Sequence, residues 1–104
     1  MTATTGKAAR RKGLQWEYRV RRAYEEAGWE VRGLEGSGDQ LCFGRDGLVI
    51  HSEAKNQERL KLPEWWRQTT TEAPKSAVPV LTCKLPGGEM VSVLRTTDLL
   101  RLTR

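Results

Sequence analysis

The fold is decided by residues 36–55, which read GSGDQLCFGRDGLVIHSEAK. Apolar residues at Leu41 and Phe43 alternate with other positions, and Asp46-Gly47 is a hairpin signal. An apolar run then begins at Leu48 and ends in charged residues. This pattern predicts two antiparallel strands joined by a tight turn.

The predicted hairpin gathers charged side chains on one face. Because side chains alternate across a strand, Glu53 and Lys55 share a face with His51. Asp39 stands at the start of the first strand, and a turn at residues 45–47 aligns it roughly with Glu53. We therefore expect two carboxylates and one amine to lie close together.

The rest of the chain surrounds this hairpin with helices and further strands. Periodicity and capping signals predict helices at residues 14–27, 63–73 and 97–102, and further strands at 29–34, 78–83 and 90–94. The order αβββαββα is typical of an α+β fold with a central mixed sheet of about five strands flanked by helices. A chain of 104 residues suffices for one domain, expected over residues 14–104.

The first predicted helix has an unusual acid. Its apolar face is expected to comprise Trp16, Val20, Ala23, Tyr24 and Ala27. Glu17 falls at the edge of this stripe and not on the outer face of the helix. A carboxylate at the edge of a buried face is unusual, and contact with the charged residues of the hairpin would explain its position.

The positive charge is concentrated at the start of the chain. The formal net charge is +5, and Lys7, Arg10, Arg11 and Lys12 all precede Glu17, the first acidic residue. We expect residues 1–13 to form a flexible basic arm that suits a polyanion, because each phosphate that it neutralises releases counterions. A merely solubilising terminus is the alternative.

Composition narrows the class of protein. The mean hydropathy is −0.62, and no apolar run approaches the ~20 residues that span a bilayer, so no membrane contact is expected. The first residues lack the apolar centre of a secretory signal. Cys42 and Cys83 are expected to be buried thiols in a reducing, cytoplasmic compartment. Two cysteines and one histidine make a poor zinc site.

The charged residues suit the hydrolysis of a phosphodiester. Mg²⁺ is commonly held by one or two carboxylates and lowers the pKa of an attacking water. Asp39 and Glu53 are the candidate ligands, with Glu17 reaching the same site, and Lys55 would orient the water or stabilise the phosphate. The alternative is that Glu53 and Lys55 form only a structural ion pair on an edge strand.

These residues resemble a known family. A helical Glu17, then Gly36-Ser37-Gly38-Asp39, then Glu53-Ala54-Lys55 resembles the PD-(D/E)XK nuclease superfamily, and most of all its archaeal-type and phage Holliday junction resolvases. The resemblance covers roughly residues 12–68. It departs from the pattern where Asp39 follows Gly38 directly, and where Ala54 replaces a frequent Cys. His51 is not part of the family pattern.

The resemblance implies a restriction-endonuclease-like fold and a homodimeric endonuclease that uses Mg²⁺, or Mn²⁺ as a substitute. It makes Glu17, Asp39, Glu53 and Lys55 the catalytic set. The expected DNA contacts are Lys7, Arg10, Arg11, Lys12, Ser37, His51 and Gln68, the last because Trp65-x-x-Gln68 resembles a helix signature of small phage nucleases. His51 is read as a structural or phosphate-contacting residue.

The function expected from the sequence is thus the resolution of four-way DNA junctions in recombination and repair, in a bacterial or phage-infected cytoplasm. Two alternatives remain. One is a nuclease of the same fold that cuts flaps or other branched DNA, and the other is a non-catalytic DNA-binding module.

Overall fold

The computed structural model describes residues 6–33, 39–56, 59 and 61–104. Its elements are α1 (Gly6–Glu26), β1 (Glu30–Gly33), β2 (Gln40–Phe43), the 3-10 turn η1 (Arg45–Gly47), β3 (Val49–Lys55), α2 (Leu62–Glu72), β4 (Val78–Lys84), β5 (Met90–Val93) and α3 (Thr96–Leu102). The predicted α+β order is confirmed.

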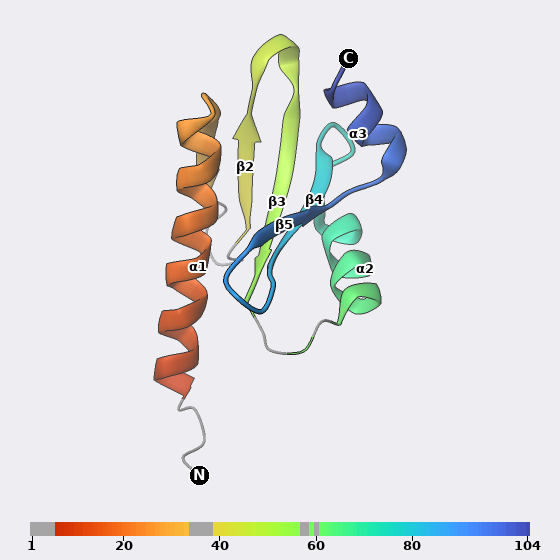
Figure 1. Cartoon of the computed structure of the whole chain (residues 1–104). Helices are drawn as coiled ribbons and strands as arrows, with labels where there is room; N and C mark the ends of the chain where they lie inside the picture. Colours follow the sequence, from red (N-terminus) through yellow and green to blue (C-terminus); the bar gives the residue numbers. More distant parts are fainter. Residues whose placement is uncertain (1–5, 34–38, 57–58, 60) are drawn as a thin grey trace.

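One five-stranded sheet forms the centre of the molecule (Figure 1). Its strands lie in the order β1-β2-β3-β4-β5. All neighbouring pairs are antiparallel except β3 and β4, which are parallel. Parallel neighbours need a long crossover connection, and α2 supplies it. The predicted mixed sheet flanked by helices is therefore confirmed.

The helices α1 and α2 flank the sheet on opposite sides (Figure 1). One buried cluster includes Ile50 and Val80, with Tyr24 of α1 packed against it. The other joins Trp65 of α2 to Leu81 of β4. Because β4 alternates between the two clusters, it is apolar along most of its length and buried on both faces.

The β2–β3 hairpin determines where the charged residues lie. Its register pairs Gln40 with Ser52, so the next residues outward, Asp39 and Glu53, continue along facing strands. The turn between the strands includes Asp46 with φ 59°, a left-handed conformation that Asp tolerates better than most residues. The hairpin predicted from the sequence is confirmed, including the approach of Asp39 to Glu53.

The N-terminal helix differs from its prediction. It begins at Gly6 instead of Leu14, so the expected flexible arm is helical over residues 6–13, while residues 1–5 lie outside the described residues. Alanine, arginine and lysine are strong helix formers, and this stretch consists largely of them. The basic side chains are therefore displayed along a continuous helix.

The apolar face of α1 is also narrower than predicted. Trp16 and Val20 are buried, but Ala23 and Ala27 are exposed. Ala23 and Ala27 belong to the last turn of the helix and the residues just beyond it, where their short side chains stay outside the core. Tyr24 alone carries the stripe onward there, packing its ring edge-on against Trp29.

Cys42 and Cys83 are free and buried, as predicted. Burial raises the pKa of both thiols, and a protonated thiol is a poor nucleophile and metal ligand. Within the described residues, none of the helices combines the length and apolar character that crossing a bilayer requires.

The packing of Trp29 against the backbone can be tested at Gly44, the residue that follows β2. A Cβ added there would lie 2.5 Å from Cζ3 of Trp29, whose ring is held against Tyr24 with centroids 5.8 Å apart. We expect Gly44→Ala to lower the free energy of unfolding by about 1–3 kcal/mol, because the ring must shift in a packed site.

The matched control for this prediction is Gly33→Ala, because no heavy atom of the described residues lies within 4 Å of a Cβ added at Gly33. Its expected effect is within about 0.5 kcal/mol. Urea unfolding of both variants measures the difference. Equal stability of the two variants would contradict the close packing of Gly44 against Trp29.

Candidate metal centre

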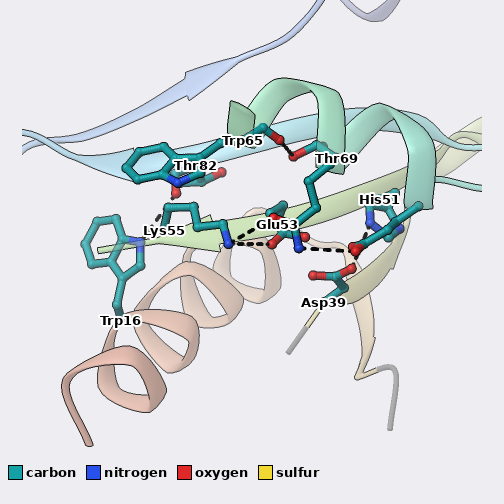
Figure 2. A network of polar contacts seen from close by, with 10 residues as sticks. Trp16, Asp39, His51, Glu53, Lys55, Trp65, Thr69 and Thr82 are labelled. Atoms are coloured by element: carbon teal, nitrogen blue, oxygen red, sulfur yellow. Dashed lines mark hydrogen bonds and ion pairs between the residues drawn. The ribbon is translucent and has the colours of Figure 1, made fainter. Parts of the chain in front are cut away.

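Four side chains converge at the open end of the β2–β3 hairpin. Asp39, His51, Glu53 and Glu72 each offer a ligand atom, and these atoms all lie within 4.8 Å of one another. Asp39 and Glu53 are only 3% and 4% exposed. Figure 2 shows Asp39, His51 and Glu53 turned toward one another beneath α2. The group therefore has the spacing of a metal site.

The two acids on the hairpin are those that the sequence predicted. Asp39 precedes β2, and Glu53 lies in β3 just beyond the last paired residue, Ser52. Their side chains share the face of the sheet that packs against α2, because Leu81, the β4 partner of Glu53, also contacts that helix. The alternation expected from the sequence thus brings them together.

His51 is buried beside the two acids of the hairpin. It is 1% exposed, and its role as a DNA contact stays a prediction. Its Nε2 atom lies 3.2 Å from Oδ2 of Asp39. The imidazole is therefore placed to fix the orientation of the Asp39 carboxylate, and the structural reading of His51 is the better one.

Glu72, the fourth member, was missed from the sequence. It is the last residue of α2 and follows Trp65 by two helical turns, so it lies on the side of the helix that carries the buried Trp65 and Thr69, although Glu72 itself is exposed. That periodicity was the available signal, but the run of threonines before Glu72 weakened the prediction of a helix there. In the structure the hydroxyls of Thr69 and Thr70 donate to the carbonyls of Trp65 and Trp66 one turn earlier.

Lys55 lies beside this acidic group. Its Nζ atom is 3.2 Å from Oε1 of Glu53 and donates to Oε1 of Gln68 at 3.3 Å. Gln68 in turn donates to Glu72. The side chain of Lys55 is 20% exposed, and Figure 2 shows its amine directed toward Glu53. Gln68, expected near the site, is indeed there.

The carboxyls of Asp39 and Glu53 have opposite pKa shifts. Burial raises the pKa of Glu53, and the neighbouring Asp39 carboxylate raises it further, while Lys55 lowers it in part. Burial would also raise the pKa of Asp39, but its interactions with His51, Glu53 and Glu72 outweigh this effect and lower it. Two close carboxylates do not both ionise readily, so the two pKa values move apart and Asp39 is the more acidic of the pair.

In the described part of the chain, the site holds three carboxyl groups beside a single lysine amine, that of Lys55. Oε2 of Glu53 is buried and has no hydrogen-bond partner among the described residues. A buried carboxylate oxygen beside another carboxylate requires either a shared proton or a cation. Three carboxylates offer the hard oxygen ligands that Mg²⁺ and Mn²⁺ prefer, so the donor set fits a divalent cation of that class.

The remaining predicted residues have mixed outcomes. Glu17 is partly buried but is not among the four converging side chains, so its prediction as a direct ligand is not matched by the geometry. Its pKa is raised by burial and by the charge of Asp39, and is lowered by Lys55, so it lies within the field of the site. Ser37 lies outside the described residues. The basic residues Lys7, Arg10, Arg11 and Lys12 are exposed on α1.

No protein-family model matches this chain, and no curated protein does. The chemistry of the site therefore carries the functional argument. It comprises three clustered carboxylates, a histidine that orients one of them, and an amine held at the solvent side.

Metal binding at this site should release a proton. A cation needs the ionised form of Glu53, whose pKa is raised in the free protein, so the apparent affinity for Mn²⁺ should rise about tenfold per pH unit until Glu53 ionises unaided. The affinity rises with pH because a raised carboxyl pKa keeps the proton bound at neutral pH, where it competes with the cation. Calorimetry in two buffers of different ionisation enthalpy would measure the released proton.

The control for the proton release is Glu30→Gln, which removes an exposed carboxylate that is paired with Arg32 and lies opposite Phe43, at the turn end of β2 and not at its Asp39 end. This variant should bind Mn²⁺ with unchanged affinity and pH dependence. An affinity that does not vary between about pH 6 and pH 9 would show that the Asp39 and Glu53 pair carries no proton in the free protein.

Proposed function

We propose that this protein is a metal-dependent DNA endonuclease of the PD-(D/E)XK type that acts as a homodimer on four-way DNA junctions. One observation carries the proposal: Asp39, Glu53 and Lys55, which resemble the motif of those nucleases in sequence, meet in space at one end of a single hairpin. A structural ion pair alone would need only Glu53 and Lys55. The buried Asp39, and Glu72 from another element, make a cation site the better explanation.

The protein's own residues have distinct roles in this mechanism. Asp39, Glu53 and Glu72 would hold Mg²⁺, and His51 keeps the Asp39 carboxylate in place from 3.2 Å. When bound, the cation would lower the pKa of the attacking water and neutralise charge on the phosphate.

Lys55 is placed to serve the substrate side of the site. It is anchored by Glu53 and Gln68, and its amine would donate hydrogen bonds to the attacking water and to the phosphate oxygens as negative charge develops. Glu17 acts at longer range, through the field that links its ionisation to those of Asp39 and Lys55.

Substrate binding is supported by the charge of α1. Its N-terminal half exposes four basic residues on a helix, namely Lys7, Arg10, Arg11 and Lys12. Cations displayed on a helix suit a phosphate backbone, because contacts with phosphates provide most of the non-specific affinity for DNA.

The homodimer is the part of the proposal that concerns assembly. A junction is cut on two strands symmetrically, and a two-fold dimer presents two equal sites. Large apolar side chains are available for a second copy to cover, because Leu14 and Tyr18 on α1 are 60% and 63% exposed, and Leu100 on α3 is 62% exposed. Sedimentation analysis of the protein measures this directly.

The experiment for the activity is a cleavage assay with four-way junction, flap and linear duplex DNA of matched length, each with Mg²⁺ or Mn²⁺. Preferential cutting of the junction is expected. Preferential cutting of the flap would instead support the branched-DNA nuclease. Binding to all three substrates without cleavage under either metal would refute the enzyme and favour the non-catalytic DNA-binding module.

A further inference from the structure

A cleft lies between α1 and the β4–β5 turn, separate from the four metal-site residues. It has a volume of about 530 Å³, which is within the range of small-ligand sites. Its lining residues are Lys12, Gln15, Trp16, Arg19, Asn56, Lys84, Leu85, Pro86 and Gly87. The four from α1 follow the spacing of one helical face, so the helix presents a single side to the cleft.

The described residues that line the cleft carry only positive charge. Their charged members are Lys12, Arg19 and Lys84, and none of the described lining residues is acidic. Three cations that line one cleft repel one another, and an anion bound in the cleft would relieve this repulsion. Gln15 and Asn56 add amide groups that donate or accept hydrogen bonds. The chemistry selects a phosphate-bearing ligand.

The wall of the cleft is rigid. Trp16 is 2% exposed and donates from Nε1 to the carbonyl of Thr82 at 3.4 Å, and the Arg19 guanidinium lies over its ring, 5.4 Å from the centroid. Opposite, Gly87 has a left-handed φ of 94° and open space where a side chain would be. The anchored Arg19 reduces the entropy lost on binding, and Gly87 leaves the backbone accessible.

The cleft adjoins the candidate metal centre along the chain on two sides. Asn56 of the cleft follows Lys55, whose amine contacts Glu53. Trp16 of the cleft precedes Glu17, whose pKa responds to Asp39 and Lys55. A ligand that occupies both places must be longer than a single phosphate.

We propose that this cleft is a subsite for the DNA strand that is cut, in which Lys12, Arg19 and Lys84 hold a backbone phosphate next to the scissile one. The inference rests on the proposed nuclease function for the identity of the strand. It explains why three cations gather away from the acids, and it assigns a role to the β4–β5 turn, which the metal centre does not use.

The test compares DNA binding by two variants that carry equal changes in charge. Lys12→Glu combined with Lys84→Glu reverses the charge of two cleft residues. Lys75→Glu combined with Lys61→Glu reverses the charge of two exposed lysines outside the cleft lining. Fluorescence anisotropy with a labelled single-stranded oligonucleotide, in EDTA so that no cleavage occurs, measures affinity against salt concentration. The cleft variant should bind at least about tenfold more weakly. The slope of log affinity against log salt concentration should also become smaller in magnitude by about one to two.

A second, local measurement separates this inference from the proposed function. A 5′-phosphorylated trinucleotide should shift the NMR signals of the Trp16 indole N–H and the Asn56 side-chain amide, and the unphosphorylated trinucleotide should shift them less. If these shifts occur in a protein that cuts no DNA, the nuclease proposal fails and the cleft stands as a binding site for a nucleic-acid phosphate. If the protein cuts junctions while the signals stay unmoved and both double variants bind alike, the cleft proposal is overturned alone.

Discussion

Asp39→Asn is expected to reduce the rate of DNA cleavage by at least about 10³-fold, because it removes the more acidic carboxyl of the buried Asp39 and Glu53 pair. Asparagine has nearly the same shape and still accepts a hydrogen bond, so the hairpin should keep its fold. With only a neutral amide beside it, Glu53 loses the negative neighbour that helps to raise its pKa. The variant should nevertheless bind divalent cations poorly, since one of the charges that attracts them is gone.

DNA binding by the Asp39→Asn protein should remain at or above the wild-type level, because removing a negative charge from the site lowers its repulsion of phosphate. Cleavage of a labelled junction and anisotropy of the same DNA measure the two properties separately. Asp46→Asn is the matched control: it makes the same chemical change in the same hairpin at an exposed residue, and asparagine tolerates the left-handed φ of 59°. Wild-type cleavage by the Asp39→Asn protein would refute the metal centre.

The part of the site that could be predicted from the sequence is the part that depends on a local register. Asp39 and Glu53 are joined by a short hairpin, and residues 40–55 indicate both its turn and the alternation of side chains along its strands. Once the position of the turn is known, the pairing of Gln40 with Ser52 follows. Lys55 follows from the same alternation. These residues needed no knowledge of how distant elements pack.

The residues that sequence reasoning missed or misplaced depend on packing between elements. Glu72 reaches the site only because α2 connects the parallel strands β3 and β4 across one face of the sheet. The side of the helix that carries Trp65 and Thr69 packs against that face. His51 shares a face with Glu53, which was predicted, but its burial depends on the helix above it. For Glu17, the position at the edge of the apolar face of the helix was predicted correctly. Helical periodicity did not determine how far Glu17 lies from the four clustered side chains.

The basic N-terminal stretch shows how a weak local preference was overlooked. Residues 6–13 were expected to be an arm because of their charge, although their alanines, lysines and arginines all favour a helix. The helix that begins at Leu14 in the prediction simply extends backward through them in the structure. One consequence is that Lys12 becomes part of a defined cleft instead of a mobile tail.

Lys55→Met is expected to reduce the rate of DNA cleavage by about 10²- to 10³-fold, because the amine that would stabilise charge on the phosphate is lost. Methionine keeps an unbranched stem in the partly exposed position that Lys55 occupies. Metal binding should survive, because the carboxylates of Asp39, Glu53 and Glu72 remain. The amine also lowers the pKa of Glu53, so the metal affinity and the residual cleavage of the variant should both shift toward higher pH.

This shift in pH dependence distinguishes a role in the site from a merely structural one. Removing a positive charge beside Glu53 disfavours its ionised form, so a more alkaline solution is needed to prepare the site for a cation. Lys61→Met, an exposed lysine at the start of α2, makes the same substitution without changing the surroundings of Glu53, and its cleavage rate and pH profile should match the wild type. If Lys55→Met lowered the rate with no change in its pH profile or Mn²⁺ affinity, the contact between Lys55 and Glu53 would have no part in preparing the site. If the rate itself were unchanged, the amine would have no part in the chemistry, and the proposed mechanism would lose the residue that links its acids to the phosphate.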